Sequence, residues 1–169
     1  MQHKTYTLKD LIDVVRESRM KTNPYYPMPD IEKSFRFAFT ECGEFEDALL
    51  RKEPGFVRNN SKEVNARAEY GQVGYMIATA MFQLVDDPEH SYDNMDYTRR
   101  IHYVTRPNDE DVYDVVTFLI NAIRREEYAH DTLSAWANSC YGYGYDPMEL
   151  LIETCKAVEE KRIPAKENE

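Results

Sequence analysis

Residues 30–50 read DIEKSFRFAFTECGEFEDALL, and this stretch decides the fold class. Its apolar residues recur three and four positions apart, which is the period of one face of a helix. Asp30 suits an N-cap, and Pro54 lies just beyond the last apolar residues. We therefore predict one helix that begins near Asp30 and ends before Pro54. Its apolar residues are Ile31, Phe35, Phe37, Ala38, Phe39, Cys42, Phe45, Ala48 and Leu49.

Helical periodicity also marks four other segments, which are residues 7–20, 60–85, 109–138 and 146–163. The helix predicted over 109–138 either continues or bends along its length. No segment shows strand alternation bounded by hairpin turns. We therefore predict an all-α helical bundle of about five main helices. The expected start signals are Thr7 with Asp10, Asn60 with Glu63, Asp109, and Asp146 followed by Pro147 and Glu149.

The length of 169 residues suits one domain. We predict a single domain over residues 1–163, with an insertion at about 86–107 and a frayed tail over 164–169. The insertion is charged, rich in tyrosine and without clean periodicity.

Acidic residues outnumber basic ones by 31 to 21, giving a formal net charge of -10. This balance argues against a nucleic-acid partner, because affinity for the phosphate backbone comes from clustered basic residues. No apolar run approaches the roughly 18 residues of a membrane span, and the N-terminus lacks the apolar stretch of a signal peptide. The three cysteines form no CxxC pair and read as reduced thiols. We expect a cytoplasmic protein with no membrane partner.

Two pairs of oxygen-bearing side chains carry the chemical signal. Glu41 and Glu44 are three residues apart, share a helix face and border the apolar arc. Glu69 and Gln72 repeat this spacing in the next helix. A single pair of this kind is usually a solvated face. Two pairs on antiparallel neighbouring helices would meet, and their hard oxygen atoms suit Mg²⁺ or Mn²⁺.

Two longer segments carry a family resemblance. FAFTECGEFEDALL (residues 37–50) and ARAEYGQVGYMIATAM (residues 66–81) resemble the MazG-like branch of the all-α nucleoside triphosphate pyrophosphohydrolases. That superfamily also includes dimeric dUTPases and phosphoribosyl-ATP pyrophosphatase, and its signature is ExxE followed by ExxD. Glu41 and Glu44 match the first pair, and Glu69 matches the second Glu. The closing YGYDPMELLIETCKAVEEKR (residues 143–162) is similar to a flanking helix of the family.

The resemblance implies hydrolysis of an NTP or dNTP to the monophosphate and pyrophosphate. It implies Mg²⁺, or Mn²⁺, held by Glu41, Glu44 and Glu69, which are also the catalytic candidates, and it implies a homodimer or homotetramer. Gln72 stands where the family has Asp, so the site loses one negative charge. Asp114 is a further candidate ligand, because the stretch with Asp111 and Asp114 also resembles the second motif.

Cations are needed for the outer phosphates of such a substrate. Position alone makes Lys33, Arg58, Lys62, Lys156 and Arg162 candidates, although each is individually more typical of a surface charge. Two alternatives stay open. One is a dUTPase-like or dCTPase-like member that uses Asp111 and Asp114, and the other is a non-catalytic nucleotide-binding or interaction module in which Gln72 marks a degraded site.

Overall fold

The computed structural model describes residues 6–52, 65–87, 100–101, 110–125 and 129–165. Within these residues the protein is all-α, as predicted, with six helices and two strands of two residues each. The helices are α1 (Leu8–Thr22), α2 (Ile31–Arg51), α3 (Ala66–Asp86), α4 (Val112–Arg125), α5 (Ala129–Gly142) and α6 (Pro147–Arg162).

Local capping explains where three of the helices begin. Thr7 caps α1 and forms a reciprocal capping box with Asp10. Asp30 caps α2 by accepting from the backbone N–H of Lys33 at 2.8 Å. Asp146 caps α6, where Pro147 occupies the first turn. These start signals were predicted and are confirmed. They can be recognised in the sequence because a capping side-chain oxygen accepts from a backbone N–H only three residues away.

Two predicted boundaries were wrong. The N-cap of α3 is Asn65, which accepts from the N–H of Ala68 at 3.3 Å, and not Asn60. The intervening sequence has one aliphatic residue, Val64, so an earlier start would give the helix little apolar surface to bury. The segment predicted over 109–138 is two helices, and α5 continues to Gly142.

A two-residue antiparallel ladder joins the N-terminus to the region predicted as an insertion. Tyr6 of β1 (Tyr6–Thr7) pairs with Ile101 of β2 (Arg100–Ile101), and Thr7 pairs with Arg100. A ladder this short has no alternating apolar pattern, so it could not be predicted from the sequence. Most of the predicted insertion at 86–107 lies outside the described residues.

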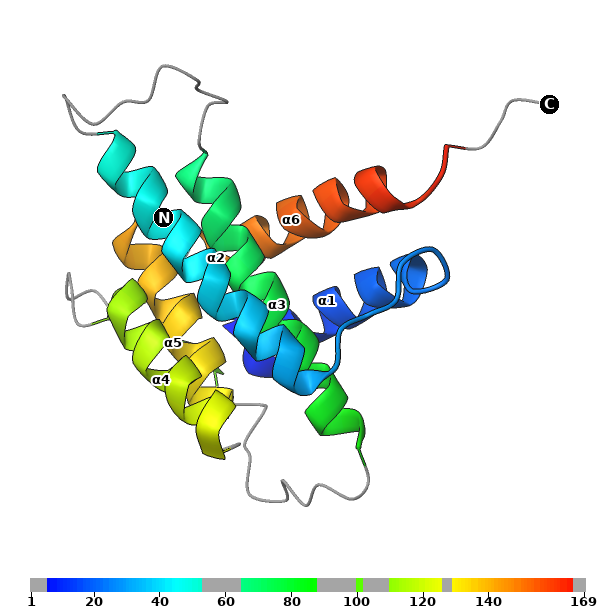
Figure 1. Cartoon of the computed structure of the whole chain (residues 1–169), viewed down its shortest axis with the longest axis horizontal. Helices are drawn as coiled ribbons and strands as arrows, with labels where there is room; N and C mark the ends of the chain where they lie inside the picture. Colours follow the sequence, from blue (N-terminus) through cyan, green and yellow to red (C-terminus); the bar gives the residue numbers. More distant parts are fainter. Residues whose placement is uncertain (1–5, 53–64, 88–99, 102–109, 126–128, 166–169) are drawn as a thin grey trace.

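Helices α2 and α3 form the centre of the arrangement (Figure 1). They run side by side in opposite directions, with α4 and α5 on one side and α1 and α6 extending together on the other. The core between them includes the fully buried aromatic side chains of Phe45, Tyr70 and Trp136. Tyr143 and Tyr145, which flank the turn between α5 and α6, are partly buried and pack against this core.

Two glycines of α3 let other helices approach closely. A Cβ at Gly71 would lie 2.2 Å from Oγ1 of Thr154 in α6, and one at Gly74 would lie 2.2 Å from the Trp136 ring in α5. Trp136 also donates its indole N–H to the carbonyl of Tyr70 at 2.9 Å. The expected close approach at these glycines is therefore made by α5 and α6.

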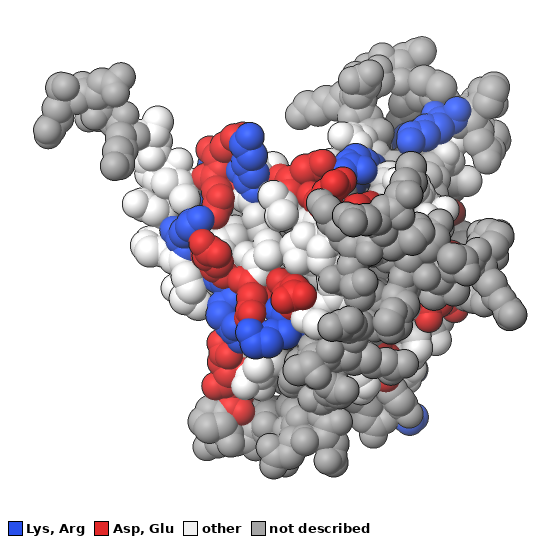
Figure 2. All heavy atoms as spheres, turned by 180° about the vertical axis from the view of Figure 1, so that it is seen from behind, with Lys and Arg blue, Asp and Glu red and all other residues white. Residues whose placement is uncertain are grey.

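Charged side chains are interleaved on the face turned to the viewer in Figure 2, where acidic and basic residues alternate. The ion pairs on α1 and α6 include those of Lys21 with both Glu17 and Glu159. Across the described parts of the chain, no helix is both long and apolar enough to cross a membrane.

Candidate metal centre

Helix α2 presents two carboxylates beside its buried stripe. That stripe consists of Phe35, Ala38, Cys42, Phe45 and Ala48, which recur at helical spacing. Glu41 follows Ala38 by three residues and precedes Phe45 by four, so its side chain starts from the edge of the buried face. Glu41 is half-buried, whereas Glu44, one turn further, is exposed.

Helix α3 brings a third carboxylate to the same place. Glu69 lies in the first turn of α3, three residues after buried Ala66 and four before buried Val73. Helices α2 and α3 pack along each other in opposite directions (Figure 1), and the first turn of α3 lies beside the part of α2 that carries Glu41 and Glu44. One carboxylate oxygen each from Glu41, Glu44 and Glu69 lies within 4.8 Å of the other two. The acidic edges of the two helices therefore meet, as the predicted metal site requires.

Crowding and burial perturb two of these acids. The pKa of Glu41 is raised to about 7, first by burial, then by the negative charges of Glu44 and Glu69. The pKa of Glu69 is also raised, again first by burial and then by Glu44. Both pKa shifts disfavour the ionised form of the carboxyl groups, and no positively charged side chain contributes to either shift.

The donor set fits a hard divalent cation. Three carboxylates offer up to six oxygen atoms, and oxygen is the ligand that Mg²⁺ and Mn²⁺ prefer. A bound dication would also remove the repulsion that raises the pKa of Glu41. Cys42 adjoins the cluster in sequence, but burial and then Glu41 raise the pKa of its thiol to about 12, so it stays protonated.

The other two predicted ligands lie differently. Gln72 is half-buried in α3, one turn beyond Glu69, and so shares its face. Asp114 lies outside the three-carboxylate group. Its Oδ2 accepts from the backbone N–H of Asp111 at 2.9 Å, while Oδ1 of Asp111 accepts from the N–H groups of Tyr113 and Asp114. Both aspartates therefore cap α4.

Three of the five predicted phosphate-binding cations fall within the described residues, and these three are not gathered around the cluster. Lys33 lies in the first turn of α2, 3.9 Å from Asp30, and eight residues or about 12 Å along the helix from Glu41. Lys156 lines a groove between α1 and α6. The guanidinium of Arg162 lies 3.5 Å from the centroid of the Tyr26 ring. Arg58 and Lys62 lie outside the described residues.

Phe37 also departs from its expected place. It was predicted on the apolar side beside the glutamates, but it is 50% exposed. Phe39 is 44% exposed. Both side chains are exposed because neither Phe37 nor Phe39 lies on the stripe that faces α3 and α4. The three cysteines are free and buried, as predicted for Cys42 and Cys155.

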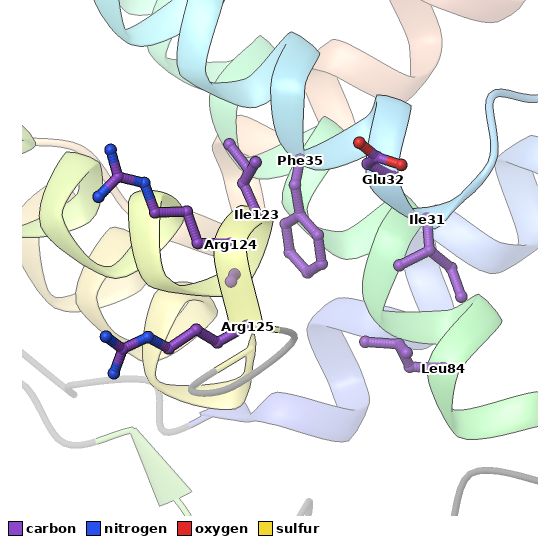
Figure 3. Close-up of a pocket in the computed structure, with 8 residues that line it drawn as sticks. Ile31, Glu32, Phe35, Leu84, Ile123, Arg124 and Arg125 are labelled. Carbon is purple, nitrogen blue, oxygen red and sulfur yellow. The ribbon is translucent and has the colours of Figure 1, made fainter.

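A separate cavity of about 410 Å³ lies where the first turns of α2 meet the ends of α3 and α4. Figure 3 shows Ile31, Phe35 and Leu84 on its wall, while the guanidinium groups of Arg124 and Arg125 point away from them. Its one carboxylate, that of Glu32, pairs with Arg36 at 2.8 Å. The chemistry-bearing residues are thus at the α2–α3 cluster and not at this cavity.

Comparisons with protein-family models, with curated proteins and with solved structures gave no match to this chain.

Proposed function

We propose that this protein is a metal-dependent nucleotide pyrophosphohydrolase that converts an NTP or dNTP to the monophosphate and pyrophosphate. The observation that carries the proposal is the convergence of Glu41, Glu44 and Glu69 from two helices to within 4.8 Å. The same three residues match the ExxE and second-Glu positions of the MazG-like motif, so geometry and sequence resemblance point to the same side chains.

The roles follow from the donor chemistry. Glu41, Glu44 and Glu69 would hold Mg²⁺ or Mn²⁺, which when bound supplies positive charge to the phosphate chain of the substrate. A glutamate of the cluster that the metal does not fully occupy accepts a proton from the attacking water. The water oxygen bonds to phosphorus as the link between the α- and β-phosphates breaks, which leaves the monophosphate and pyrophosphate.

Further features belong to the same proposal. Arg58 and Lys62 are the phosphate-binding candidates that sequence position favours, because the segment 53–64 connects the end of α2 to the turn that carries Glu69. We infer a homo-oligomer, in keeping with the resemblance and with exposed apolar side chains such as Phe37. Three free cysteines are typical of a reducing compartment such as the cytoplasm.

The deciding experiment is a panel of NTPs and dNTPs with Mg²⁺, in which pyrophosphate and the monophosphate are identified as products. Glu41→Gln should abolish turnover. Glu46→Gln is the matched control, because Glu46 is on the same helix, lies outside the cluster, and accepts a hydrogen bond from Tyr113 at 2.9 Å that an amide oxygen can also accept. Turnover that survives in Glu41→Gln would refute the proposed site.

Gln72 favours a second candidate, a nucleotide-binding module without catalysis, because an amide contributes no negative charge to the cluster. A nucleotide that raises the melting temperature without being hydrolysed would support this candidate. The dUTPase-like or dCTPase-like alternative is less favoured, since Asp111 and Asp114 are engaged in capping α4.

A further inference from the structure

Helices α2 and α4 share an outward face, which one hydrogen bond fixes in register. The hydroxyl of Tyr113, in the first turn of α4, donates to Oε1 of Glu46 in α2 at 2.9 Å. The helices run in opposite directions, because the end of α4 lies at the beginning of α2 around the cavity of Figure 3. Phe39 precedes Glu46 by seven residues and Ile120 follows Tyr113 by seven, which is about two turns in each helix. Phe39 and Ile120 therefore lie beside each other on the same face. The α2–α4 face consists of Arg36, Phe39, Gly43 and Glu46 of α2 and Tyr113, Thr117, Ile120 and Arg124 of α4.

The large apolar side chains of the α2–α4 face are open to solvent. Tyr113 is 62% exposed, Phe39 is 44% exposed and Ile120 is 37% exposed. In Figure 1 the two helices lie toward the viewer, and none of the other described helices crosses over them. Exposed apolar residues that gather on one face, instead of occurring singly, are typical of an interaction surface.

Gly43 lies in the middle of this face, inside α2, with no packing reason in the chain. A Cβ at Gly43 would meet nothing within 4 Å, in contrast to Gly71 and Gly74, where α6 and α5 approach. Glycine inside a helix costs about 1 kcal/mol relative to alanine. The close approach of a second molecule to the α2–α4 face would account for it.

Charge is separated along the face and identifies that second molecule. Arg36 and Arg124 are at the end where α2 begins and α4 finishes, whereas Glu46 and the adjoining Asp111 are at the opposite end. Glu32, which pairs with Arg36 at 2.8 Å, offsets one of the two positive charges. In a dimer with a two-fold axis across the helices, the face meets its own copy in the reverse direction. The basic end of one protomer then meets the acidic end of the other.

We propose that the α2–α4 face binds the same face of a second copy of this chain in a two-fold homodimer. Phe39 follows Arg36 by three residues, and Glu46 follows Gly43 by three. One antiparallel register of the two α2 helices therefore places Phe39 over Gly43 of the partner subunit and Arg36 opposite Glu46 of the partner subunit. The ring gains the space that the glycine leaves, and opposite charges meet on both sides of the axis. This contact serves the homo-oligomer proposed above, and it does not depend on the enzymatic activity.

The test is sedimentation velocity of the full chain over a wide range of protein concentration, in EDTA and without nucleotide, so that a failure of the proposed activity does not affect it. The parent chain should reach twice its mass of 19.9 kDa, and added salt should weaken the association. Phe39→Glu should be monomeric. Ile152→Glu is the matched control, because Ile152 is 52% exposed on α6, away from this face, and this variant should remain dimeric.

Gly43→Leu separates an interface from a role within the chain. Since a side chain at this position meets nothing in its own protomer, the variant should keep or exceed the stability of the parent chain at low concentration, where both are monomers. It should nevertheless fail to dimerise, because its side chain occupies the space of Phe39 of the partner subunit.

Charge exchange tests the two-fold register. Arg36→Glu and Glu46→Lys each place like charges opposite each other twice in a homodimer, so each should raise the dimer Kd about tenfold. A mixture of the two variants forms a heterodimer in which both contacts join opposite charges, so association should return in the mixture. Glu46→Gln keeps an oxygen acceptor and should weaken the dimer far less. A parent chain that is monomeric at every concentration, which would leave the face to a different partner, or a dimer that survives both Phe39→Glu and Gly43→Leu, would overturn the proposal.

Discussion

Replacing Glu41 by glutamine should stabilise the metal-free protein above neutral pH, although it removes a residue from the proposed active site. In the folded protein the pKa of Glu41 is about 7, against an ordinary value of 4.5. Between these values the folded state holds a proton that the unfolded state has lost. Stability therefore falls as pH rises from about 4.5 to 7, and the full penalty is present above pH 7.

The magnitude follows from the same pKa. The gap between 4.5 and about 7, at about 1.4 kcal/mol per pH unit, gives an upper limit of about 3 kcal/mol. Glu41 is only half-buried, so solvent screening reduces this to about 1 to 2 kcal/mol. For a chain of this size, that corresponds to a rise in Tm of roughly 2–8 °C at pH 8 for Glu41→Gln. Gln has nearly the same shape and can donate its amide N–H to a neighbouring carboxylate.

The assay is thermal or urea denaturation in EDTA at pH 8 and again near pH 5, where the carboxyl group is largely protonated in the folded state. The stabilisation by Glu41→Gln should be large at pH 8 and small near pH 5, and Glu46→Gln, which changes a residue of the same helix outside the cluster, is the matched control. A Glu41→Gln protein that is less stable than the parent at pH 8, or whose advantage is the same at both pH values, would refute the idea that crowding and burial strain this carboxylate.

Three further predictions concern metal, site charge and packing. Millimolar Mg²⁺ should raise the Tm of the parent protein and should not do so in Glu41→Gln; an equal rise in both would place the metal elsewhere. Gln72→Asp adds a negative charge to the face of α3 that carries Glu69. It should therefore strengthen the Mg²⁺-dependent rise in Tm and lower the stability of the metal-free protein. An unchanged response to Mg²⁺ would show that Gln72 does not face the metal. Gly74→Ala places a Cβ against Trp136 and should cost about 1–3 kcal/mol in urea denaturation; a change below about 0.5 kcal/mol would show that the ring can move aside.

Local signals in the sequence were enough to predict much of the fold. The caps at Thr7, Asp30 and Asp146 could be recognised because each acts on a backbone N–H three residues away. The start of α3 was misplaced, because Asn60 and Asn65 are chemically alike as caps and only one of them precedes a run that packs. The prediction that the segment 109–138 continues or bends left its division into α4 and α5 open, because apolar residues continue on both sides of the division.

The candidate metal centre could be predicted only in part, because it depends both on the spacing within a helix and on the packing of two helices. Spacing places Glu41 and Glu44 on one face, but their meeting with Glu69 depends on the packing of two helices and could only be stated as a condition. The capping role of Asp114 depends on where α4 begins, and this was uncertain.

The carboxylate cluster depends on the register of one helical hairpin. All its members lie between residues 41 and 69, so its assembly requires no contact between distant parts of the chain. Lengthening the connection between α2 and α3 would leave the direction of each side chain unchanged. One residue inserted in α2 between Ala38 and Glu41 would instead turn both glutamates, together with Cys42, Phe45 and Ala48, by about 100° relative to Phe35 and Ala38. The glutamates could then stay beside Glu69 only if Phe35 and Ala38 left the core.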